Sequence, residues 1–144
     1  MDRNKLFKIV VYLALSLYIL DSLAQKFYWY YSIYWFDMLA HFLGGFWVAV
    51  FFLWYFSIVH LPFLRRPILD LNKQTLWQAL LFVLFIGLCW EAGEFLTSNF
   101  IGLEPWSALD TASDIFFDLA GGTVAMFYVF WKIMPSRLNK VEWK

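Results

Sequence analysis

Apolar residues gather in four long stretches of the chain, at residues 6–24, 36–59, 76–96 and 111–134. Each stretch is close to the length of about 20 residues that an α-helix needs to cross the hydrocarbon core of a bilayer. Within each stretch the apolar residues are continuous rather than alternating, which excludes the strands of a membrane β-barrel. The pattern predicts an all-α integral membrane protein, with a single transmembrane domain over residues 1–144 that forms a four-helix bundle.

The composition agrees with a multi-pass membrane protein. Of the 144 residues, 62% are hydrophobic and only 15% are charged, whereas a soluble domain carries about 25% charged residues. The net charge is zero, so the chain lacks the basic surplus of a nucleic-acid-binding protein. Cys89 is the only cysteine, which excludes an intramolecular disulfide.

Basic residues indicate the orientation in the membrane. All but one lie at the N-terminus, in the second connection or at the C-terminal end: Arg3, Lys5, Lys8, Arg65, Arg66, Lys73, Lys132, Arg137, Lys140 and Lys144. Lys26 alone lies on the other side. The positive-inside rule then places both termini in the cytoplasm and the aromatic segment 27–36 at the outer interface.

The first apolar stretch has a second interpretation, as a cleaved signal peptide. It has a basic start, and Ser22, Leu23 and Ala24 at its end resemble a signal-peptidase site. Asp21, close before that site, and the length of the apolar run favour a retained helix.

Acidic residues gather at the helix ends that this orientation places outside. The acids of that half are Asp21, Asp37, Glu91, Glu94, Glu104, Asp110, Asp114 and Asp118. Residues three or four apart share one helical face, which pairs Asp37 with His41, Glu91 with Glu94, and Asp114 with Asp118. Small residues such as Gly44 and Gly121 continue these faces and let membrane helices approach closely. The polar faces are therefore expected to point toward one another.

The energy of acids in a membrane favours a functional site. A charged Asp at mid-membrane costs about 2.5–3.5 kcal/mol, and adjacent carboxylates repel unless they bind protons or share a cation. No Lys or Arg is expected at that depth. The predicted metal ligands are Asp37, His41, Glu91, Glu94, Asp114 and Asp118; taken alone, Asp37 with His41 would be a helix cap beside an interfacial histidine. Asp110 is assigned to a helix cap and Asp21 to a helix end.

Two segments repeat a polar frame. DMLAHFLGG (37–45) and DIFFDLAGG (114–122) share D-x3-[HD]-x2-G-G. A duplicated two-helix hairpin would produce such a repeat, and chance similarity between two apolar Gly-Gly segments is the alternative.

Taken together, FDMLAHFLGG, CWEAGEF and LDTASDIFFDLAGG resemble the YjdF-like family of small prokaryotic inner-membrane proteins. The order of acids on successive helices is also similar, more loosely, to VanZ-like proteins, which are associated with glycopeptide resistance at the cell envelope. The resemblance implies a polytopic helical fold in the cell inner membrane and a shared polar site at the six residues named above. Family members are often longer, which leaves open a homo-oligomer or another membrane partner.

The first hypothesis for function is a metal-binding membrane protein whose site opens to the outer leaflet. Carboxylates with one imidazole suit a divalent ion such as Mg, Mn, Ca or Zn. In an enzyme, the ion would polarise an oxygen of a lipid-borne or envelope substrate or activate water, with His41, Glu91 or Glu94 as catalytic base. The second hypothesis is a proton- or cation-coupled transporter or channel subunit, and the third is a structural protein with a polar packing cluster. The lipid bilayer is an expected partner, and nucleic acid is not.

Overall fold

The computed structural model describes residues 3–58, 73–101 and 107–133, and all the regular structure in these ranges is helical. The elements are α1 (Arg3–Lys26), α2 (Trp29–Ser32), α3 (Phe36–Ile58), α4 (Lys73–Ile101), α5 (Ala108–Tyr128) and a closing π-helical turn, η1 (Val129–Ile133). The all-α class predicted from the apolar stretches is therefore confirmed for the described part of the chain.

Three of the helices are long and apolar enough to cross a membrane. These candidate spans are Asn4–Lys26, Phe36–Phe56 and Gln74–Phe100. Helix α5 has 21 residues, which at 1.5 Å per residue gives a length of about 31 Å. It is not among the candidate spans, because carboxylates in its first half lower its mean hydropathy.

Helix α3 begins at Phe36 as predicted, whereas the other described helix ends differ from the apolar stretches by a few residues. Helix α4 starts three residues earlier, at Lys73, and ends five residues later, at Ile101. Apolar residues mark only the part of a helix that contacts lipid or the protein core. The polar turns at its ends also form helical hydrogen bonds, so the helix is longer than its apolar stretch. The short helix α2 was not predicted; it follows Tyr28, whose φ of 57° turns the chain sharply after α1. The predicted ends at residues 59 and 134 fall outside the described residues.

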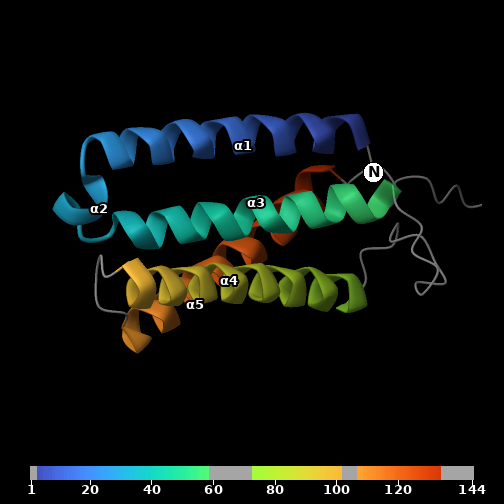
Figure 1. Cartoon of the computed structure of the whole chain (residues 1–144). Helices are drawn as coiled ribbons and strands as arrows, with labels where there is room; N and C mark the ends of the chain where they lie inside the picture. The colour runs from blue at the N-terminus through green and yellow to red at the C-terminus, as the bar shows by residue number, and fades with distance from the viewer. Residues whose placement is uncertain (1–2, 59–72, 102–106, 134–144) are drawn as a thin grey trace, which may run out of the picture.

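Helices α1, α3 and α4 lie side by side, and α5 crosses behind α3 at an oblique angle (Figure 1). Glycine makes this crossing close. A Cβ added at Gly45 of α3 would collide with the backbone carbonyl of Asp118, and one added at Gly121 of α5 would collide with the carbonyl of Phe42. Backbones in direct contact are the geometry that small residues allow between membrane helices.

The apolar core lies toward the other end of the bundle from the acids. Its largest fully buried apolar side chains are Leu6, Val50, Leu53, Val83 and Val129, from α1, α3, α4 and η1, and α5 adds the smaller Ala125. Helix α1 joins this core beside α3, where the indole N–H of Trp47 donates to the carbonyl of Val10 at 3.0 Å. Apolar packing therefore stabilises the end of the bundle that lies opposite the polar residues.

A tyrosine of α2 connects the end of α1 to the start of α3 through a hydrogen bond and a ring contact. The hydroxyl of Tyr30 donates to Asp21 Oδ1 at 2.8 Å, and its ring meets Phe36 edge-on at 5.0 Å. Burial, together with this hydrogen bond to the Asp21 carboxylate, raises the pKa of Tyr30 above its ordinary value of 10.0. Tyr30 therefore stays a neutral donor at physiological pH, and holds α1 against the helix that carries Asp37.

Candidate metal centre

Three predicted ligands converge between α3 and α5. One ligand atom from each of Asp37, His41 and Asp114 lies within 4.8 Å of the other two. Asp37 and His41 stand one turn apart at the start of α3, so both face the same way. Asp114 comes from the first half of α5 and is 2% exposed. Two carboxylates and an imidazole at this spacing are a donor set that divalent ions accept.

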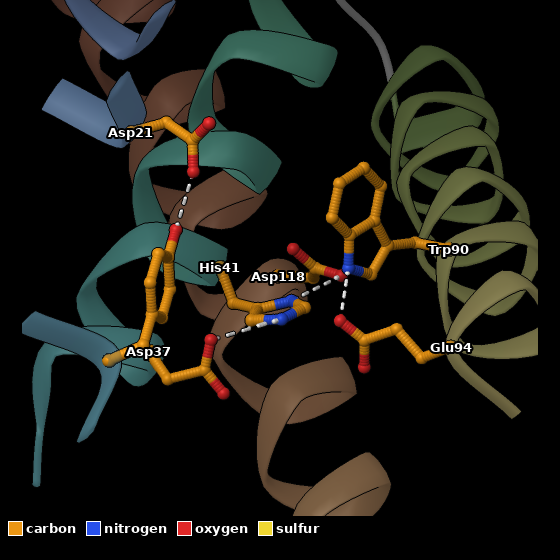
Figure 2. A network of polar contacts seen from close by, with 7 residues as sticks. Asp21, Asp37, His41, Trp90, Glu94 and Asp118 are labelled. Atoms are coloured by element: carbon orange, nitrogen blue, oxygen red, sulfur yellow. Dashed lines mark hydrogen bonds and ion pairs between the residues drawn. The ribbon is translucent and has the colours of Figure 1, made fainter. Parts of the chain in front are cut away.

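Asp118 contacts the ring nitrogen of His41 that points away from Asp37. Its Oδ2 lies 3.5 Å from His41 Nδ1, while His41 Nε2 lies 3.9 Å from Asp37 Oδ1. Figure 2 shows the imidazole between these two carboxylates. Histidines that bind metals usually direct their second ring nitrogen to a carboxylate or a carbonyl, which sets the tautomer and the ring orientation. Asp118 is therefore placed to orient His41 rather than to join the three converging ligands.

The carboxylate of Asp118 sits where α3, α4 and α5 meet. A Cβ added at Gly44 of α3 would lie 4.0 Å from its Oδ1, and one added at Gly87 of α4 would lie 2.5 Å from its Oδ2. Glycine at position 87 thus leaves the space that this carboxylate occupies. The sequence alone predicts such glycines at helix contacts, and does not mark Gly87 as part of the site.

Glu91 is buried beside the three ligands without being one of them. It is 6% exposed, and its Oε1 has no hydrogen-bond partner within the described ranges 3–58, 73–101 and 107–133. Its charge acts on both Asp37 and Asp114, which places it near the centre. A buried carboxylate oxygen without a donor is costly, so this atom is suited to a ligand's hydrogen bond or to a cation.

Glu94 occupies a more open position. It is exposed, and its Oε1 accepts a 2.8 Å hydrogen bond from the indole N–H of Trp90 on the same helix. In Figure 2 both side chains project from α4 toward the side where His41 and Asp118 lie. Of the six predicted ligands, the structure gathers Asp37, His41 and Asp114, and sets Asp118, Glu91 and Glu94 around them.

The start of α5 differs in detail from the predicted cap. The N-cap residue is Ser107, whose hydroxyl accepts from the backbone N–H of Asp110 at 3.4 Å. Asp110 lies in the first turn and is exposed. Its charge favours the positive end of the helix dipole and also acts on Asp37 and Asp114. Asp110 is nevertheless exposed, and it is not one of the three converging ligands.

The described base nearest in sequence to the cluster contacts an aromatic ring. Lys26 ends α1, and its ammonium lies 5.7 Å from the centroid of the Phe27 ring. The other basic residues among those described, Arg3, Lys5, Lys8, Lys73 and Lys132, are near the helix ends that face the apolar core. Clustered carboxylates need a cation or protons to coexist in a poorly hydrated site.

Comparison with known protein families gives a match that covers nearly the whole chain. Residues 2–134 match the family described as "Predicted membrane protein (DUF2238)". The chain belongs to the DUF2238 family. That family is of the same kind as the YjdF-like proteins that the motifs resemble, and its description places the chain in a membrane. Comparisons of the DUF2238 protein with curated proteins and with solved structures give no match.

Proposed function

We propose that this multi-pass membrane protein binds a divalent cation through Asp37, His41 and Asp114, close to the outer face of the cell inner membrane. The observation that carries the proposal is the convergence of these three ligand atoms within 4.8 Å. Asp118 supports it, because its contact with His41 Nδ1 leaves Nε2 for the ion. Three protein ligands leave coordination positions for water or substrate, as in catalytic rather than structural metal sites.

The proposed position near the outer face follows from chain direction and charge. The ligands lie at the start of α3 and in the first half of α5, while the surplus of Lys and Arg belongs to the opposite ends of the four-helix bundle. By the positive-inside rule these opposite ends and both termini are cytoplasmic. A site at this depth is within reach of lipid headgroups and of lipid-linked envelope substrates.

A transporter is less well supported by the packing. Beyond the centre, α3 and α5 touch backbone to backbone at Gly45 and Gly121. Of the buried polar residues described, Thr75 alone lies toward the other end, near the start of α4. A proton or cation path across the membrane needs polar groups or water throughout. The described residues offer such groups at one end of the bundle.

Metal analysis of detergent-purified protein tests the proposal. We expect the wild-type chain to retain or take up one divalent ion, and added Mn²⁺ to raise its unfolding temperature, because a ligand that binds only the folded state stabilises it. Asp114→Asn should lose the ion, whereas Asp110→Asn, an exposed acid one turn away on α5, should keep it. Circular dichroism checks that both variants are folded.

The wild-type chain alone can refute the proposal. Purified protein that contains no divalent ion, and whose unfolding temperature does not change with millimolar Mg²⁺, Mn²⁺, Ca²⁺ or Zn²⁺, would leave the cluster as a packing device. Equal metal content in Asp114→Asn and wild type would have the same consequence.

A further inference from the structure

Glu91 faces Asp114 across the contact between α4 and α5. Residues one turn apart on α4 meet residues one turn apart on α5 in reverse order: Val83 lies against Gly122, and Gly87 lies against Asp118. The next turn of each helix brings Glu91 opposite Asp114. The electrostatic interaction between these two side chains agrees with this register. The position of Glu91 is thus a result of helix packing, independent of the three-ligand geometry.

One carboxylate oxygen of Glu91, Oε1, has no hydrogen-bond donor among the residues that the structure describes, although the residue is more than nine-tenths buried. It is also outside the set of atoms that lie within 4.8 Å of one another. A group just beyond the ligands, with an unpartnered acceptor oxygen, is suited to accept a hydrogen bond from a water molecule that fills an open coordination position.

We infer that Glu91 accepts the proton of a water molecule held at the metal centre, and that this centre hydrolyses an uncharged acyl ester carried at the membrane surface. The inference rests on the proposed metal site. Of the three bases considered from the sequence, His41 is held between Asp37 and Asp118, and Glu94 is exposed and bonded to Trp90. Glu91 alone of the three is buried and unpartnered.

The reaction consumes one water and involves no oxidation or reduction. The water passes a proton to the Glu91 carboxylate as its oxygen forms a bond to the carbonyl carbon of the ester. The bond from that carbon to the alcohol oxygen then breaks, and the alcohol takes the proton from Glu91. The products are a carboxylic acid and an alcohol, and Glu91 is again a carboxylate.

Charge decides the class of substrate. Two carboxylate ligands balance a divalent ion. The carboxylates of Asp118, Glu91 and Glu94 around them leave the site negative when ionised. A phosphate ester would bring a further negative charge into this surrounding, which repels it. A neutral acyl ester brings none, and its carbonyl oxygen can be polarised by the ion.

The test uses the metal-loaded full chain in detergent with two probes, 4-nitrophenyl octanoate and bis(4-nitrophenyl) phosphate. We expect the wild type to hydrolyse the acyl ester in a metal-dependent manner, and to hydrolyse the phosphodiester at least ten times more slowly. Glu91→Gln should lower kcat about 100-fold, the usual contribution of a general base, with unchanged metal content. Glu91→Asp should recover part of the rate, and Asp110→Asn serves as the acid-to-amide control.

Metal content measured in the same samples separates the two levels of proposal. A wild-type chain without metal refutes the metal centre itself. A metal-loaded wild type that does not hydrolyse the acyl ester refutes only the inference about Glu91, as does a Glu91→Gln variant with the wild-type rate. Loss of the ion from Glu91→Gln would make Glu91 a ligand, and would also overturn its role as proton acceptor.

Discussion

At the scale of single residues, Asp118 connects all three helices around the centre. It belongs to α5, its Oδ2 contacts His41 on α3, and the absence of a side chain at Gly87 on α4 makes room for it. The acid is 7% exposed, and so has little water to solvate its charge. In the proposed metal site, Asp118 would act by orienting His41, so we expect its loss to have a smaller effect than the loss of a direct ligand.

Asp118→Asn should therefore weaken Mn²⁺ binding roughly 10- to 100-fold, the usual effect of removing such a supporting carboxylate. His41→Ala should abolish binding, and the double variant should bind no worse than His41→Ala alone, because the two residues act as one unit. Calorimetric titration of the folded variants measures this. Separate, additive losses would indicate instead that Asp118 forms independent helix contacts.

At the scale of elements, the crossing of α3 and α5 depends on glycine. Gly45 and Gly121 face the carbonyls of Asp118 and Phe42 so closely that any side chain would force the backbones apart. This crossing also brings Asp37 and His41 of α3 to the acids of α5. Helix packing and site geometry are therefore coupled through the same contact.

Gly45→Ala should destabilise the protein by about 1–3 kcal/mol, the usual cost of overpacking a close contact, and weaken metal binding as well. Two alanine substitutions are matched controls. At Gly44 the new Cβ would lie 4.0 Å from the nearest atom, and at Gly93 it would meet nothing within 4 Å. Both substitutions should be neutral or slightly stabilising, because Ala has a higher helix propensity than Gly. Thermal unfolding in one detergent compares the three; equal stability of all three would contradict the crossing.

At the scale of the whole molecule, the polar centre and the apolar core occupy opposite ends of the same bundle. The buried acids and His41 lie at one end, and side chains such as Leu53 and Val129 fill the other. Among the basic residues that the structure describes, all except Lys26 lie at the helix ends on the side of the apolar core. By the positive-inside rule, this polarity predicts that the proposed centre faces the outside.

Reporter fusions test that orientation. Fusions after Leu71 and at Lys144 should report the cytoplasm, and a fusion after Leu103 should report the outside, because of the distribution of Lys and Arg. Two lysines introduced by mutation into the segment after Lys26 should weaken this preference. This variant tests whether the distribution of basic residues causes the orientation. An external signal at Lys144 would place the centre at the cytoplasmic face and exclude an outer-leaflet substrate.

The sequence by itself determined the helical class, the approximate extent of the long helices and the level at which the acids lie. These follow from local rules: continuous apolar stretches fit a bilayer as helices, and a fixed rise per residue sets the depth of each side chain. The same rules put Asp37 and His41 on one face. They did not reveal the short helix α2 or the N-cap at Ser107, which depend on backbone turns at single residues.

Only the tertiary structure decided how the six predicted ligands are divided. Three converge, Asp118 orients His41, Glu91 is buried without a partner, and Glu94 is turned toward Trp90. Spacing along a helix cannot distinguish these roles, because each depends on how that helix is rotated and where it crosses its neighbours. The rotation of each helix and the position of its crossing are set by contacts between residues far apart in the chain. The most important of these is the approach of Gly45 to the backbone of Asp118.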